Sequence, residues 1–221
     1  YRPVLYIPSK EEVKELLQKM DIRTSHNSEQ FRLDRECKIL FLLYFCCGLR
    51  LSEGRLLKWE HIDLDKGILT VLGSKGNKDR LVYLPQDSLP VLKNYKERQE
   101  MLFPGIDWAF PGKDPHKPVS CSGVESSFNR HWAMLPVART VDKHPTPHCL
   151  RHAFVVERFN EWMHQGIDTN TMLPYLSRYL GHKSPDETYY YYHLAGKAFD
   201  TIREKDSVSG KVIPEVIPYE E

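Results

Sequence analysis

The sequence predicts a mainly α-helical domain with one small antiparallel β-hairpin. Three observations lead to this fold class. Apolar residues recur at helical spacing over most of the 221 residues. Only residues 67–84 contain two short β-branched and apolar runs joined by a glycine-rich turn. Glycine, proline or a small polar residue stands where most of the helical patterns begin or end.

The first two helices are defined by their ends. Ser9 and Glu12 have the spacing of a capping box, which predicts that an amphipathic helix begins after Ser9. A second helix is expected over about residues 29–47, and its C-terminal half is apolar nearly all round, so it should lie in the centre of the core. Gly48 is the expected C-cap of this helix.

A short helix and the hairpin follow. Ser52 is expected to cap a helix over about residues 53–59, which places Arg50 in a tight joint between two helices. The runs 67–72 and 80–84 should form a hairpin with a basic, glycine-rich tip, and a third short strand could precede it.

The rest of the chain is predicted to be helical, apart from a Pro/Gly-rich loop at about residues 108–117. Thr169 is the expected cap of one helix, and Gly166 and Gly181 should end two of them. We expect residues 1–206 to form one domain and residues 207–221 to form a tail. The helices are expected over about residues 87–101, 122–135, 148–165, 169–180, 185–193 and 195–205.

The composition is ordinary for a soluble globular protein, with 41% hydrophobic and 28% charged residues. No apolar run approaches the ~20 residues of a membrane span. The five cysteines show no C-x-x-C spacing, so reduced thiols are expected rather than disulfides or a zinc site. The net charge of +1 does not by itself indicate nucleic acid, but basic residues gather in residues 75–80 and 130–152, and such a face can bind DNA.

Arg50 and Arg151 are candidates for a phosphate clamp. A guanidinium presents a planar fork of donors and remains charged, so two of them could offset the charge of a phosphodiester under attack. The alternative is that each arginine pairs with a nearby carboxylate, such as Glu53 or Glu157.

His148 and His182 stand at the edges of predicted helices. Either could bind the same phosphate or move the proton of a nucleophile. The alternative is a structural cap or a partly buried ring. The spacing of histidines and cysteines does not indicate a metal site, and no metal or other cofactor is expected.

Residues 189–192 are four consecutive tyrosines. A phenol with a pKa of ~10 is a poor nucleophile until a base or a positive field activates it, and the arginines and histidines could do this. Attack on DNA would store the bond energy in a phosphotyrosine ester, so rejoining would need neither ATP nor metal. One or two of these tyrosines should simply pack in the core.

The tip of the hairpin offers Lys75 and Lys78, either of which could protonate the leaving 5′-oxygen. The alternative is that both are solvated turn residues. The P-loop pattern is absent, which argues against an ATPase.

Four motifs in order resemble the catalytic domain of the tyrosine recombinases, the phage integrase and Xer-type family. The similarity extends from the first capped helix to His193. The motifs are Gly48-Leu-Arg-Leu-Ser-Glu53, the hairpin segment Lys75-Gly-Asn-Lys-Asp-Arg80, Thr146-Pro-His-Cys-Leu-Arg-His-Ala-Phe154, and Leu180-Gly-His182 with a tyrosine nine residues later.

This resemblance implies a site-specific recombinase that cuts and rejoins DNA through a 3′-phosphotyrosyl intermediate. It implies that Tyr191 is the nucleophile, Lys75 the general acid and Glu53 a supporting residue, although Tyr190 remains a competitor because the chain surrounds Tyr191 with other tyrosines. The phosphate would be activated by Arg50, His148, Arg151 and His182. The residues expected to bind DNA are Lys78, Arg80, Arg130 and Lys183.

The resemblance also implies partners. They are double-stranded DNA and three further copies in a homo-tetramer on paired DNA sites, with weak or no association without DNA. Members of the family usually carry an N-terminal core-binding domain, and we expect this chain not to include it. The tail could dock on a neighbouring subunit or fold back. The expected location is the bacterial cytosol or nucleoid, away from membranes.

Integrases, transposon recombinases and chromosome-dimer resolvases cannot be separated by these motifs. A type IB topoisomerase would share the chemistry, but the order of the motifs is closer to the Xer type. A catalytically silent DNA-binding relative would not need the full residue set. A metal-dependent nuclease would need paired carboxylates near the histidines, and the sequence offers no convincing pair.

Overall fold

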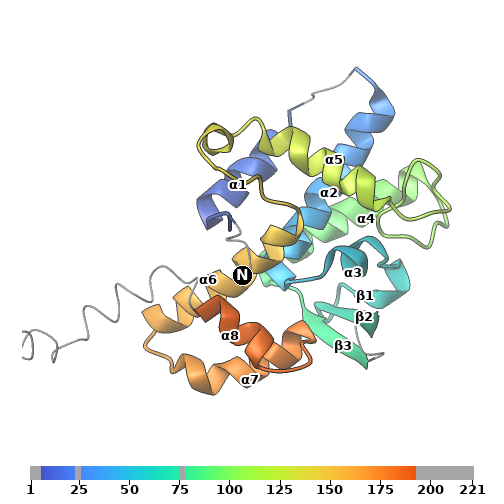
Figure 1. Cartoon of the computed structure of the whole chain (residues 1–221). Helices are drawn as coiled ribbons and strands as arrows, with labels where there is room; N and C mark the ends of the chain where they lie inside the picture. The colour runs from blue at the N-terminus through green and yellow to red at the C-terminus, as the bar shows by residue number, and fades with distance from the viewer. Residues whose placement is uncertain (1–5, 23–25, 75–77, 193–221) are drawn as a thin grey trace, which may run out of the picture.

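The computed structural model describes residues 6–22, 26–74 and 78–192 (Figure 1). They form a mainly helical domain with a small antiparallel sheet, which confirms the predicted fold class. The helices are α1 (Lys10–Lys19), α2 (Ser28–Cys47), α3 (Leu51–Arg55), α4 (Leu89–Leu102), α5 (Cys121–Trp132), α6 (His148–His164), α7 (Thr169–Leu180) and α8 (Asp186–Tyr192). The strands are β1 (Ile62–Asp63), β2 (Ile68–Ser74) and β3 (Lys78–Tyr83), and the 3-10 turns are Trp59–His61, Gln86–Ser88 and Pro136–Arg139.

The ends of the first two helices are as predicted. The Ser9 hydroxyl accepts from the Glu12 N–H at 3.2 Å, and the Glu12 carboxylate accepts from the Ser9 N–H at 2.8 Å, so the capping box is complete. Gly48 ends α2 in the left-handed conformation, with φ of +62°. A Cβ there would lie 2.6 Å from Phe154 Cδ1, so both the backbone and the packing require glycine.

Two predicted caps are wrong. Arg50, not Ser52, is the residue before α3, because the Glu53 carboxylate accepts the Arg50 N–H at 2.7 Å. Thr169 is the first residue of α7 rather than its cap. Asp168 caps that helix, because its carboxylate reaches the Asn170 N–H at 3.0 Å.

The sheet has the order β1-β2-β3 and is antiparallel throughout, so the third strand is present. In β2 and β3 the register pairs Ile68 with Tyr83 and Val71 with Arg80. One face packs on the helices and buries Val71, whereas Tyr83 is exposed on the other. This arrangement directs Arg80 toward the end of α7, which β3 contacts.

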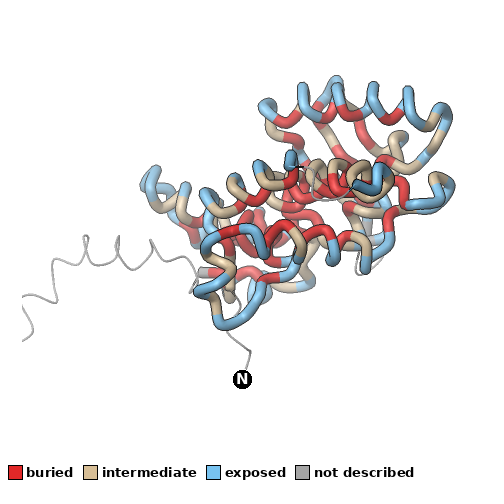
Figure 2. The backbone as a smooth tube through the Cα atoms, turned by 90° about the horizontal axis from the view of Figure 1, so that it is seen from above, coloured by how far each residue is buried: buried red, intermediate tan, exposed pale blue. Residues whose placement is uncertain are grey.

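The interior contains two apolar clusters, and α6 contributes residues to both. Figure 2 shows in red the buried residues along the backbone. Leu150, in the first turns of α6, belongs to the larger cluster with residues of α1, α2, α4, α5 and the sheet. Phe154 and Phe159 belong to the smaller cluster with residues of α7 and α8. In Figure 1, α7 and α8 lie together on one side of α6. Arg151 therefore stands at the boundary between the two clusters.

Several expectations fall outside the described residues. They concern the tip of the hairpin at residues 75–77, the helix at 195–205 and the tail at 207–221. The five cysteines are free thiols. Within the described ranges, every helix is too short or too polar to cross a membrane.

Candidate active site

The C-terminal end of α7 organises the site. The last carbonyls of a helix have no partner inside it and carry the negative end of its dipole. Three arginines from other elements donate to the consecutive carbonyl oxygens of residues 179–181. Arg80 Nε donates at 2.8 Å, Arg151 Nη2 at 2.9 Å and Arg50 Nη2 at 2.6 Å. One helix end thus brings together the cationic groups of α6, β3 and the joint before α3.

Glu53 holds two of these guanidinium groups. Arg80 donates both terminal nitrogens to the two carboxylate oxygens at 2.8 Å, and Arg50 Nη1 donates to Oε1 at 2.8 Å. Burial alone would raise the pKa of Glu53, but the hydrogen bonds from Arg80 and Arg50 lower it to about 2. Because one carboxylate faces three guanidinium groups, an excess of positive charge remains at this position.

Arg151 is the most deeply set of the three, with 2% of its surface exposed. Its Nη1 donates to the carbonyl of Gly48 at 2.5 Å, so it bridges the ends of α2 and α7. Burial, and then the charge of Arg50, lower its pKa to about 10. The group therefore stays protonated at neutral pH, where its charge acts on the histidines around it.

His182 lies between Arg151 and α8. Its Nε2 is 3.0 Å from Arg151 Nη2, and its Nδ1 is 2.7 Å from the Thr188 hydroxyl. An arginine can only donate, so Nε2 is the acceptor and the ring proton is on Nδ1, which donates to Thr188. Burial and the charge of Arg151 lower the pKa of His182 to about 3, so the ring is neutral.

His148 begins α6 and has an exposed edge. Its ring packs edge-to-face on His152, with centroids 4.6 Å apart. Loss of water around the ring and then the charges of Arg151 and Arg50 lower the pKa of His148.

Tyr191 is the tyrosine whose hydroxyl reaches this site. It is 6% exposed, and its Oη lies 2.5 Å from His152 Nδ1. Burial raises the pKa of Tyr191 to about 12, against the opposing charge of Arg151. The Tyr189 hydroxyl donates to Asn170 at 3.1 Å, and the ring of Tyr190 packs edge-on against Tyr191.

The structure thus brings Arg50, Glu53, Arg151, His182 and Tyr191 together, with His148 next to them through His152. Arg80, which was expected to bind DNA, has a side chain that is 9% exposed and forks onto Glu53. It supports the site from within.

The other expected DNA-binding residues are scattered. Lys183 is exposed just after His182, whereas Arg130 lies on α5 and donates to Asp34 at 2.7 Å. Lys75 and the side chain of Lys78 lie outside the described residues.

His152 and Thr188 were missed by the sequence interpretation. His152 stood inside the quoted motif, but only its contact with Tyr191 gives it a role. Thr188 had no sequence signal, because a threonine before a tyrosine run has no distinctive spacing.

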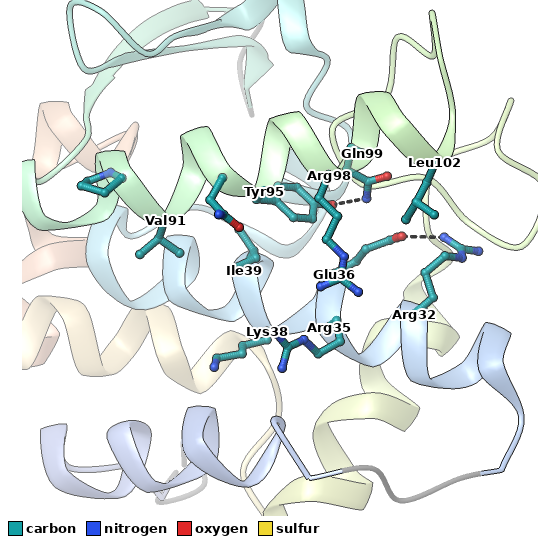
Figure 3. Close-up of a pocket in the computed structure, with 12 residues that line it drawn as sticks. Arg32, Arg35, Glu36, Lys38, Ile39, Val91, Tyr95, Arg98, Gln99 and Leu102 are labelled. Carbon is teal, nitrogen blue, oxygen red and sulfur yellow. Dashed lines mark hydrogen bonds and ion pairs between the residues drawn. The ribbon is translucent and has the colours of Figure 1, made fainter.

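A separate cavity of about 390 Å³ lies between α2 and α4 (Figure 3). Its walls include Arg32 and Glu36, which pair at 2.6 Å, and the buried Glu36 carboxyl has a pKa raised by burial to about 7. It shares no lining residue with the group around Arg151. The two sites are therefore distinct.

Fold and site together define a class of protein: a mainly helical domain that gathers arginines and neutral histidines beside a buried tyrosine. The chain belongs to the phage integrase family, whose sequence model matches residues 9–197.

Two curated relatives illustrate the match. The tyrosine recombinase XerC of Alcanivorax borkumensis is 32% identical over 190 residues, which is 85% of this chain and 56% of the relative. The tyrosine recombinase XerA of Pyrococcus furiosus is 32% identical over 162 residues, which is 72% of this chain and 51% of the relative. The chain spans 46% to 61% of the length of such relatives.

Solved structures share the fold. The XerH site-specific recombinase in its post-cleavage complex with difH has a TM-score of 0.70 at 22% identity, covering 92% of this chain and 54% of that one. The XerA recombinase has a TM-score of 0.66 at 23% identity, covering 94% and 66%. At these identities the likeness supports the fold alone.

Proposed function

We propose that this chain is the catalytic domain of a site-specific DNA recombinase of the integrase or transposon-recombinase type. It would cut and rejoin double-stranded DNA through a covalent 3′-phosphotyrosyl intermediate. One observation carries this proposal: Arg50, Arg151, His182 and Tyr191, from four separate elements, converge on one site with an excess of positive charge.

The cationic groups would bind the scissile phosphate and offset the charge that develops on it. Arg50 is the partly exposed guanidinium, Arg151 stands behind it, and His148 supplies a neutral ring donor. His182 bonds Arg151 and Thr188 in this structure, so it would act on the phosphate by holding Arg151. A single donor of this kind typically contributes ~10²–10³ in rate. Glu53 and Arg80 would hold Arg50 in place rather than touch the DNA.

Tyr191 would be the nucleophile. Its Oη would bond to phosphorus, the bond to the 5′-oxygen would break, and Lys75 would protonate that oxygen. Lys78 remains the alternative acid. Support for Tyr191 over Tyr190 comes from its hydroxyl, which lies among the site residues, whereas the ring of Tyr190 packs beside it in the smaller cluster.

The proposed partners are double-stranded DNA and other copies in a tetramer on paired sites, in the bacterial cytosol or nucleoid. The XerH and Tn1549 integrase structures are DNA complexes, which supports a DNA partner. The outer contacts to DNA would come from Lys78, Arg130 and Lys183. Because the chain spans about half of its relatives, tight binding should require the full-length protein.

The test uses full-length protein, a chelator and a nicked DNA from the junctions of the source element. Cleavage next to the nick releases the 5′-OH fragment, so any covalent adduct is trapped and migrates with the DNA on a denaturing gel. We expect an adduct from the native protein and from Tyr190→Phe, but none from Tyr191→Phe.

Tyr190→Phe is the matched control, because it removes one hydroxyl from the neighbouring position of the same helix. Loss of the adduct only in Tyr190→Phe would move the nucleophile to Tyr190. If the native protein binds the DNA and forms no adduct, the chain is a silent DNA-binding relative.

A further inference from the structure

The hydrogen bond between Tyr191 and His152 points to a chemical role for His152 in the proposed reaction. We propose that His152 is a catalytic residue that accepts the phenolic proton of Tyr191 as Tyr191 attacks the DNA phosphate. The proposal rests on the recombinase function and names the base that serves it.

The geometry favours His152 over the other two histidines. Tyr191 Oη and His152 Nδ1 are 2.5 Å apart in a buried position, and their ring centroids are 5.2 Å apart. Both nitrogens of His182 are engaged, one by Arg151 and one by Thr188. The ring of His148 packs against His152. Within the described residues, the histidine that hydrogen-bonds to Tyr191 Oη is His152.

The Tyr191 phenol is protonated at neutral pH, so its attack on phosphorus requires a base. The His152 ring is neutral at the same pH and can act as that base. With a pKa of about 12, only about one Tyr191 phenol in 10⁵ is ionised at neutral pH, so attack needs a proton acceptor in contact with it. Burial, His148 and Arg151 lower the pKa of His152 to about 3. The ring is therefore neutral over the physiological range, and its Nδ1 lone pair can face the phenol.

Substrate binding would make this base stronger. Several groups act on His152 and its partner Tyr191. They are His148, Cys149 and Arg151 on α6, Tyr190 and Glu187 on α8, and His182 after α7. A phosphate bound at Arg151 offsets the positive charge that disfavours a protonated His152. The proton affinity of His152 should rise when DNA is in place, and rise further as negative charge develops on phosphorus.

The step balances. Tyr191 Oη forms a bond to phosphorus while its proton passes to His152 Nδ1, and the bond from phosphorus to the 5′-oxygen breaks. The leaving oxygen takes its proton from the general acid. In the rejoining step, the 5′-oxygen bonds to phosphorus while its proton returns to the deprotonated general acid. The bond from phosphorus to Tyr191 Oη breaks, and protonated His152 returns its proton to the departing phenol.

A purely positioning role is the competing explanation, and asparagine separates the two. The amide of His152→Asn lies near the place of Nδ1 and can still hydrogen-bond to Tyr191, but it cannot accept a proton. If His152 only positions the phenol, His152→Asn should restore what His152→Ala loses.

The first experiment needs no DNA. In nitrogen NMR spectra of the histidine rings, we expect His152 at neutral pH to carry its proton on Nε2, with Nδ1 unprotonated. Its signals are identified by their loss in His152→Asn, and Tyr191→Phe should shift the Nδ1 resonance. A native His152 with its proton on Nδ1 would donate to the phenol and so could not accept from it, which would overturn the proposal.

The second experiment measures single-turnover adduct formation by full-length protein on the nicked DNA, from about pH 5 to about pH 9. Native cleavage should rise with pH and then level off. His152→Asn should be ~10²–10⁴-fold slower and should rise about tenfold per pH unit across the range, because only the ionised phenol can now attack.

His131→Asn is the matched control, since it removes a fully buried imidazole on α5 whose Nδ1 bonds to the Ser127 carbonyl. It should lower stability without changing the pH profile. A native rate and profile in His152→Asn would refute the proposal while leaving the recombinase function intact. Absence of any adduct from the native protein would instead count against the function itself.

Discussion

At the scale of single residues, two buried carboxylates make pH-dependent contributions of opposite sign to the free energy of unfolding. Glu53 is held ionised by Arg80 and Arg50, which lower its pKa to about 2. Glu36 is buried between α2 and α4, and burial raises its pKa to about 7 although Arg32 contacts it. The difference follows from the number of donors, since Glu53 receives hydrogen bonds at both oxygens, whereas Glu36 Oε2 has no partner in the described structure.

We predict that Glu53→Gln lowers the free energy of unfolding by about 3–5 kcal/mol at neutral pH, because two guanidinium groups lose their counter-charge. The contribution of Glu53 is complete above its unfolded-state value near 4.5 and declines as pH falls toward about 2. In urea unfolding between about pH 3 and about pH 8, the free energy of unfolding of Glu53→Gln should therefore fall less in acid than that of the native protein.

Glu36→Gln serves as the comparison, with the opposite sign. The folded protein binds a proton at Glu36 more tightly than the unfolded chain, so this group destabilises the fold as pH rises from about 4.5 to about 7. Glu36→Gln should stabilise the protein at about pH 8, by at most about 3 kcal/mol. If the free energy of unfolding changed equally with pH in Glu53→Gln and Glu36→Gln, the opposite pKa shifts of Glu53 and Glu36 would both be contradicted.

At the scale of elements, the ends of the helices position the site. The C-terminus of α7 gathers three arginines, the C-terminus of α2 accepts from Arg151, and α8 is tied to the site through Thr188. The contacts of Arg50, Arg80 and Arg151 with Gly181, Tyr179 and Gly48 join elements that are far apart in the chain.

We predict that Thr188→Val slows adduct formation, because the Nδ1–H of His182 then loses its acceptor in a partly buried position. An unsatisfied buried donor costs about 1–3 kcal/mol. Hydrogen exchange should be faster in α8 than in the native protein. Thr188→Ser keeps the hydroxyl and should behave nearly as the native chain, so equal defects in both variants would exclude this explanation.

We predict that Gly48→Ala is more destabilising than Gly166→Ala. Both glycines have positive φ, +62° and +72°, so both substitutions carry the same backbone strain of about 1 kcal/mol. Only at Gly48 would the added Cβ also lie 2.6 Å from Phe154 Cδ1, which should add about 1–3 kcal/mol of overpacking. Denaturant unfolding measures the difference, and equal losses would show that Phe154 moves aside freely.

At the scale of the whole molecule, α6 contributes to both apolar clusters, and the proposed catalytic groups lie where the two clusters meet. Arg151 is placed between Leu150 of the larger cluster and Phe154 of the smaller one. The helix that carries the proposed nucleophile belongs to the smaller cluster, so its stability depends on a limited set of contacts around Phe159, Leu173 and Leu180.

We predict that Phe159→Ala loosens α7 and α8 more than the rest of the domain. Removing a buried phenylalanine costs about 3–5 kcal/mol, and here the loss falls on the smaller cluster. Hydrogen exchange should increase most in these two helices. Phe128→Ala, at an equally buried position of the larger cluster, is the control and should affect α2 and α5 instead. The same exchange pattern in both variants would mean that the clusters open together.

The sequence by itself determined the fold class and most helix ends. It also predicted the candidate site residues Arg50, His148, Arg151, His182 and Tyr191. These are local signals, because a capping box, a left-handed glycine or a motif of fixed spacing can be seen within a few residues. The tertiary structure decided the partners. Arg80 turns inward to Glu53 and His152 meets Tyr191 across 39 positions in the chain, because separate elements pack around the end of α7. No local pattern encodes such a contact, since it depends on where the packed helices end.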